Sequence, residues 1–247
     1  VPAMTDEQLY FVDTFADGSA SGKRRDLNWP ELAGPPLYEK IENGGYHIIQ
    51  TAFDSATTAI LNPERHYRSG NEYDADITID ASSQPEAAAG IVFRWRSDDE
   101  YYVFAVDGLS RYSIWLRKGK WQELRNALSA WSEHDAVKPI GETNHLRLID
   151  EGDRLIGYVN QDQVFDLNIQ PQIDDGAIGI YLATTKNTGV AKPHTEIVVQ
   201  NYSAQPYVEP TATVESMVDF GTPTPLPTLM PRRRATPTVP VTPTARP

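Results

Sequence analysis

The sequence of 247 residues contains no cysteine. A disulfide framework, a thiolate metal site and a cysteine nucleophile are therefore excluded. The chain also lacks any run of about 18 apolar residues, the length that a membrane-spanning helix needs. Cations are scarce, because 22 basic residues face 34 acidic ones and the formal net charge is −12. Since phosphate contacts need clustered Lys and Arg, this balance argues against a nucleic-acid partner.

No stretch has the sustained period of a long helix. Instead, short runs of β-branched and aromatic residues alternate with polar ones between turn sequences, which is typical of an all-β sandwich or barrel. The predicted strands are Phe11–Phe15, Tyr46–Phe53, Tyr73–Ile79, Gly90–Arg96, Tyr101–Val106, Tyr112–Arg117, Asn144–Ile149, Arg154–Asn160, Gln163–Leu167, Ala177–Leu182 and Thr195–Tyr202. Residues 16–36 are rich in Gly, Pro and charge and predict a loop, with Trp29 and Leu32 anchoring it to the core.

The three strands within residues 90–117 define two faces of one sheet. A period of two places Ile91, Phe93 and Trp95 on the core side. The same count adds Tyr102, Phe104, Val106, Tyr112, Ile114 and Leu116 to that side. The opposite face gathers Arg94, Arg96, Tyr101, Val103, Ser113, Trp115 and Arg117. This second face carries aromatic and cationic side chains and is the candidate binding surface.

Residues 72–80 alternate acidic and apolar side chains. Glu72, Asp74 and Asp76 share one side of this predicted strand. If the strand pairs with residues 90–96, these carboxylates would lie beside Arg94 and Arg96, and each pair would contribute up to about 1 kcal/mol.

The composition changes near Gln205. Ten of the 19 prolines lie in the last 43 residues, interleaved with Thr, so residues 205–247 are predicted to form an extended Pro/Thr-rich tail behind a domain of residues 1–204. One interpretation is a spacer of a surface protein, with Thr as sites of O-glycosylation. The other is a tail that docks on its own sandwich or on another copy. Its candidate docking residues are Met217, Val218, Phe220, Leu226 and Leu229.

The order of several short motifs resembles the concanavalin A-like lectin/glucanase superfamily, in the branch near modules related to 3-keto-disaccharide hydrolases. The motifs are Gly90–Arg94, Glu100–Phe104, Gly119–Trp121, Asn144–Leu148, Gly176–Ile180 and Val199–Tyr202. The resemblance covers residues 11–203. It implies a jelly-roll sandwich of two antiparallel sheets, with carbohydrate as the commonest ligand class.

Laminarinase-type glucanases on this fold carry three carboxylates on one strand face, because retaining hydrolysis needs a nucleophile and an acid/base. Glu72, Asp74 and Asp76 match that spacing, with Asp in place of the final Glu. The incomplete motif predicts no catalysis, and a glycoside hydrolase is the less favoured alternative. No cofactor is predicted apart from calcium, which lectin-like sandwiches often bind and for which Asp98 and Asp99 are weak candidate ligands.

Two functions are expected. The first is a non-catalytic, extracellular or cell-surface module that binds a glycan or polysaccharide. Its candidate ligand-binding residues are Arg94, Arg96, Tyr101, Trp115 and Arg117. The alternative is a structural subunit of a surface layer or filament, whose tail binds neighbouring copies of the chain.

Overall fold

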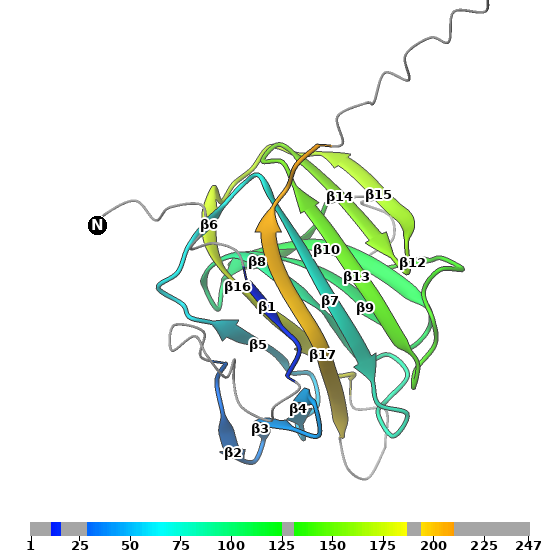
Figure 1. Cartoon of the computed structure of the whole chain (residues 1–247). Coiled ribbons are helices and arrows are strands. Elements are labelled where there is room, and N and C mark those ends of the chain that lie inside the picture. Colours follow the sequence, from blue (N-terminus) through cyan, green and yellow to red (C-terminus); the bar gives the residue numbers. More distant parts are fainter. Residues whose placement is uncertain (1–10, 16–28, 125–130, 187–193, 210–247) are drawn as a thin grey trace, which may run out of the picture. The chain divides into compact units, whose positions relative to one another are not determined.

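The structure is a computed structural model that describes residues 11–15, 29–124, 131–186 and 194–209. The described residues up to Val208 belong to one compact unit. This unit consists of two antiparallel sheets that pack face to face (Figure 1). The predicted all-β sandwich is therefore confirmed. Within the described ranges no helix is long and apolar enough to cross a membrane.

The first sheet has nine strands. They are β1 (Phe11–Asp13), β2 (Leu32–Gly34), β3 (Leu37–Glu42), β4 (Gly45–Gln50), β7 (Asn71–Ile79), β13 (Thr143–Asp150), β14 (Arg154–Val159), β15 (Asp162–Asn168) and β17 (Thr195–Pro206). Their order is β15-β14-β13-β7-β17-β4-β3-β2, with β1 paired to β17. Figure 1 shows the long strands β7, β13 and β17 side by side in this layer.

The second sheet has eight strands. They are β5 (Ala56–Leu61), β6 (Tyr67–Arg68), β8 (Ala88–Ser97), β9 (Glu100–Asp107), β10 (Arg111–Lys118), β11 (Lys120–Glu123), β12 (Ser132–Glu133) and β16 (Asp175–Ala183). Their order is β11-β10-β9-β8-β16-β5, while β12 pairs with β10 and β6 with β16. The predicted strands did not include β2, β3, β5, β6, β11 or β12. In β3 only Glu39 is buried, so this strand lacks the alternating apolar pattern by which the others were found.

The core lies between the sheets and is built from alternate residues of their long strands. Ile91, Phe93, Phe104, Ile114 and Leu116 from the eight-stranded sheet are all fully buried there, as the period of two predicts. They face side chains of the nine-stranded sheet that include Tyr46, Tyr73, Ala75, Ile77, Leu146, Leu148, Ile197 and Val199.

A β-bulge in β8 reverses the predicted orientation of two residues. From Val92 to Trp95, β8 has one residue more than the paired segment of β16. Its register with β9 also shifts, between Phe93 and Ser97, and Arg94 has a φ of +50°. An extra residue in one strand exchanges the faces of the residues that follow. Arg94 consequently points into the interior, where it is 1% exposed, and Trp95 packs on the outer face. The predictions that placed Arg94 outside and Trp95 in the core were wrong.

Arg94 is held in the interior by a buried carboxylate. Its Nε donates to Asp150 at 2.8 Å, and its Nη2 donates to the other oxygen of the same carboxylate. It also donates to the carbonyls of Ile173 and Gly152, both at 2.8 Å. These contacts satisfy the guanidinium, which would otherwise make its burial costly.

The acidic strand β7 lies in the other sheet from β8, so the expected pairing of its carboxylates with Arg94 and Arg96 was wrong. β7 pairs with β13 and β17. Its Asp74 and Asp76 contact His145 at 3.3 and 2.7 Å. Its Glu72 accepts from Arg147 at 2.6 Å. The carboxylates of β7 therefore pair with side chains of β13, the neighbouring strand of the same sheet.

Of the two residues predicted to anchor the loop of residues 16–36, Trp29 is buried and Leu32 is exposed. Trp29 is 3% exposed, and its indole N–H donates to Asp13 at 3.0 Å, so this prediction is confirmed. Leu32 is 50% exposed, and it lies in β2 rather than in a loop. Its role as an anchor was therefore wrong.

Candidate functional site

Aromatic side chains gather on the face of the eight-stranded sheet that points away from the core. We call this the outer aromatic face and define it as Trp95, Tyr101, Trp115, Trp121, Trp131 and Tyr181. Small and β-branched residues form its floor, namely Ala88, Val92, Val103, Ala105 and Ala177. Both sets alternate along their strands with core residues, so the same period that builds the core also places the aromatics outside. Four of the chain's five tryptophans lie here.

The outer aromatic face is curved. Trp121 lies on β11, and Tyr181 lies four strands away on β16, a separation of about 19 Å in a flat sheet. Their ring centroids are nevertheless only 6.0 Å apart. Trp121 also contacts Tyr101 at 5.8 Å and Trp115 at 6.1 Å. The sheet must therefore curl, so that a side chain of its edge strand reaches over the middle of the face.

Two arginines extend the outer aromatic face. The Arg117 guanidinium lies over the ring of Trp121 at 5.2 Å, and that of Arg111 lies over Trp131 at 5.7 Å. Arg117 also donates to Asp99 at 2.8 Å. Burial raises the pKa of Tyr101 to about 12, so its hydroxyl remains a hydrogen-bond donor at neutral pH. Tyr101 and Tyr181 are only 3% and 8% exposed, so the rings that a ligand can reach on this face are those of Trp95, Trp115, Trp121 and Trp131.

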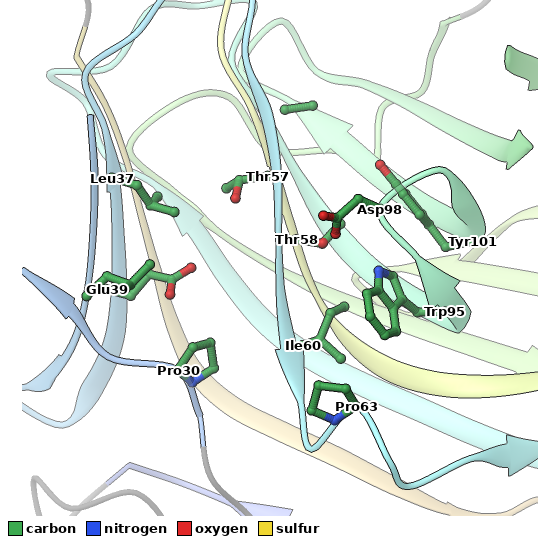
Figure 2. A pocket seen from close by; sticks show the side chains of 12 residues that line it. Pro30, Leu37, Glu39, Thr57, Thr58, Ile60, Pro63, Trp95, Asp98 and Tyr101 are labelled. Carbon is green, nitrogen blue, oxygen red and sulfur yellow. The ribbon is translucent and has the colours of Figure 1, made fainter. Parts of the chain in front are cut away.

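A pocket of about 460 Å³ adjoins one end of this face. It shares Trp95 and Tyr101 with the face, and Ile60, which also lines it, packs in the same cluster as these residues. Figure 2 shows Trp95, Asp98 and Tyr101 on one side, Glu39 and Leu37 on the other, and Thr57, Thr58 and Ile60 of β5 between them. Its volume falls within the range of small-molecule sites, about 300 to 1,000 Å³. Mixed apolar and polar walls are also typical of such sites.

Two polar groups in the pocket lack protein partners among the described residues. Glu39 is 2% exposed, and its carboxyl makes no hydrogen bond or ion pair there. Desolvation raises the pKa of Glu39 to about 7. The indole nitrogen of Trp95 is buried and also has no acceptor. Buried polar atoms are usually satisfied, so the Trp95 N–H requires an explanation.

The structure separates the five predicted ligand-binding residues. Tyr101, Trp115 and Arg117 lie together on the outer aromatic face. Arg94 lies in the core, and this candidate was wrong. Arg96 is engaged by Asp175, whose backbone carbonyl accepts from it at 2.7 Å and whose carboxylate accepts from it as well.

Sequence reasoning missed Trp95, Trp121, Trp131, Tyr181 and Glu39. The concentration of tryptophan within residues 95–131 was a usable signal for three of them. Tyr181 offered the same signal as the other outward-facing residues, because it alternates with the core residues Ile180 and Leu182. Glu39 offered none, since an acidic residue in a mostly polar strand reads as solvated.

The other candidates lie elsewhere. In the described ranges no three His, Asp or Glu side chains are grouped as metal ligands. Of the two weak calcium candidates, Asp99 pairs with Arg117 and Asp98 lines the pocket. The carboxylates of Glu72, Asp74 and Asp76 lie on the outer face of the nine-stranded sheet, opposite the outer aromatic face. The docking candidates Met217, Val218, Phe220, Leu226 and Leu229 lie outside the described residues.

No protein-family model matches the chain, and no curated protein matches its sequence. Solved structures do match its fold. A carbohydrate-binding module from Bacillus subtilis has a TM-score of 0.52 at 17% identity, and the match covers 72% of this chain and 91% of the module. The catalytic domain of an endo-1,3-beta-glucanase (laminarinase) from Thermotoga petrophila has a TM-score of 0.54 at 9% identity, with 80% and 96% covered.

A beta-glucanase from Bacillus licheniformis has a TM-score of 0.51 at 10% identity, and the match covers 79% of this chain and 97% of that one. At such identities the likeness concerns the fold. It confirms the predicted concanavalin A-like jelly-roll sandwich. The branch near 3-keto-disaccharide hydrolases stays a prediction.

Proposed function

We propose that this chain is a non-catalytic carbohydrate-binding module that acts outside the cell and holds a glycan on its outer aromatic face. The observation that carries the proposal is the curved cluster in which Trp121 contacts Tyr101, Trp115 and Tyr181. Sugar rings present flat C–H faces between polar edges. Aromatic side chains stack on such faces, while their N–H and O–H groups and nearby arginines bind the hydroxyls.

The named activities of fold neighbours support the same ligand class. They include the carbohydrate-binding module and the glucanases described above. Fold likeness alone does not transfer an activity. The residues of the outer aromatic face therefore carry the argument for this chain.

The position of the incomplete carboxylate motif supports a non-catalytic role. Glu72, Asp74 and Asp76 lie on the other side of the sandwich from the outer aromatic face. Asp74 and Asp76 both contact His145, and Glu72 is held by Arg147. Carboxylates that already pair with cations are poor nucleophiles and acids for glycoside hydrolysis.

The test is a glycan array and a polysaccharide affinity gel with the full chain, Trp115→Ala and Trp121→Ala. We expect the parent to retain at least one polysaccharide. Each substitution should weaken that binding about tenfold or more, the loss of one stacked ring.

Tyr158→Ala is the matched control, because Tyr158 lies under Arg147 at 5.4 Å on the other sheet, much as Trp121 lies under Arg117. This variant should bind like the parent. Absence of glycan binding by the parent, or unchanged binding in both tryptophan variants, would contradict the proposal. Release of shortened sugars by the parent would contradict its non-catalytic part.

A further inference from the structure

We propose that the pocket beside the outer aromatic face is a subsite for an amino sugar whose amine is free and positively charged. This inference rests on the proposed function and names the ligand chemistry at one end of the same site. The side chains that line the pocket support an amino sugar as the ligand.

The walls of the pocket are negatively charged. Glu39 and Asp98 both line it, and of the described lining residues none carries a positive charge. Arg117, which lies over Trp121, is paired with Asp99. An anionic sugar such as a uronic acid would therefore meet carboxylates without a compensating cation. The net charge of −12 adds a field of the same sign around the whole protein.

Glu39 has no cationic partner among the described residues of the pocket. The residue is buried on β3 and directed into the pocket (Figure 2). Its strand neighbour Lys40 pairs with Glu42 instead. Burial, and after it the charges of Glu39 and Glu31, raises the pKa of Tyr46 on the adjacent strand. Asp98 lies across the pocket. None of these supplies a positive charge, so a bound ammonium group would provide the missing partner.

The indole N–H of Trp95 is buried and has no acceptor among the described residues. An ammonium group has only donors, so a simple amine would leave this N–H unsatisfied. A sugar hydroxyl or ring oxygen can accept from it. The hydroxyls of Thr57, Thr58 and Tyr101 also line the pocket and can bind further sugar hydroxyls. The ligand that satisfies both groups therefore carries an amine beside hydroxyls.

The aromatic ring of Trp95 can also contact the bound sugar. A cation near the face of a tryptophan is attracted by the ring, and a sugar C–H face packs on it. The pocket's apolar walls, Pro30, Leu37, Ile60 and Pro63, limit the water that would screen the carboxyl.

The test titrates the isotope-labelled full chain with glucosamine, glucose and N-acetylglucosamine near neutral pH. These sugars differ only in the ammonium, hydroxyl or acetamide group at one carbon. The readout is the indole N–H resonance of Trp95, assigned with Trp95→Phe. We expect glucosamine to shift this resonance and to bind about tenfold or more tightly than the two neutral sugars.

Glu39→Gln should remove that preference and leave the weak binding of glucose unchanged. Asp98 lies at the exposed mouth of the pocket, so Asp98→Asn should reduce the preference for glucosamine less than Glu39→Gln does. Equal binding of the three sugars, or a preference that survives Glu39→Gln, would overturn the inference. The inference would also be overturned if glucosamine bound without shifting the indole N–H resonance of Trp95. If Trp121→Ala still abolishes polysaccharide retention in that case, the proposed function stands and only the amino-sugar subsite fails.

Discussion

Arg94 and Arg96 are two residues apart and have different energetic roles. Arg94 is 1% exposed and makes two hydrogen bonds with the Asp150 carboxylate. Arg96 pairs with Asp175, and its side chain is 40% exposed. Removing one partner of a buried pair leaves an uncompensated charge, whereas an exposed pair is screened by water.

We therefore expect Arg94→Met to lower the free energy of unfolding by about 3 to 5 kcal/mol. Arg96→Met, the matched control, should lower it by less than about 1 kcal/mol. Urea titration followed by tryptophan fluorescence measures both. Similar losses in the two variants would contradict the assignment of Arg94 to the core.

Glu39 makes stability depend on pH. Its pKa is about 7 in the folded chain and 4.5 for an ordinary glutamate. The folded state therefore holds the proton more tightly than the unfolded state. Its contribution to stability is present below about pH 4.5 and is lost as the pH rises through about 7.

Glu39→Gln should consequently raise the unfolding free energy by about 1 to 3 kcal/mol near pH 8, and change it little near pH 4.5. Thermal unfolding of the parent and the variant at both pH values tests this, in the absence of sugar. A variant that is destabilised at the higher pH would show that the carboxylate has a partner in the folded chain.

Among the elements, β8 and β16 are joined by a close contact at the bulge. A Cβ on Gly176 of β16 would lie 2.4 Å from both the backbone carbon of Arg94 and the carbonyl oxygen of Trp95. The register of β16 with β8 also shifts here, between Ala177 and Gly179. The bulge that turns Arg94 inward and Trp95 outward thus depends on a glycine in the neighbouring strand.

Gly176→Ala should lower the unfolding free energy by about 1 to 3 kcal/mol, because backbone atoms must move to make room for the methyl group. It should also alter the Trp95 indole resonance, since that ring follows the bulge. Gly34→Ala in β2 is the control, because a Cβ there meets nothing within 4 Å. A tolerated Gly176→Ala with an unchanged Trp95 signal would refute this account of the bulge.

For the whole molecule, the compact unit ends at Val208. Strand β17 extends to Pro206, and the backbone N–H of Tyr207 donates to Gly70 at 2.9 Å. The Pro/Thr composition of the following residues does not support a core. The stability of the sandwich should therefore come from the residues up to this point.

A chain that ends at Val208 is expected to unfold within about 2 °C of the full chain. A chain that ends at Ala204 should unfold several degrees lower, because it loses the last pairs of β17 with β7. Differential scanning calorimetry compares the three. A marked loss of stability in the chain ending at Val208 would show that the tail docks on the sandwich, as the alternative interpretation of the sequence holds.

Local sequence patterns were enough to predict the fold class and most strand positions. Alternation along β9 and β10 correctly separated core residues such as Phe104 and Ile114 from outward residues such as Tyr101 and Trp115. The side of the sheet to which a residue points can be predicted locally, because successive residues of a strand point to opposite faces.

Tertiary structure decided the rest. One residue of β8 in excess over β16 exchanged Arg94 and Trp95 between the two faces, and no local pattern marks it. The curl that brings Trp121 over Tyr181 and the pocket between β3, β5 and the turn after β8 join residues distant in sequence. Such features depend on which strands become neighbours. Residues such as Glu39 therefore gain their chemistry from burial, which the sequence pattern does not encode.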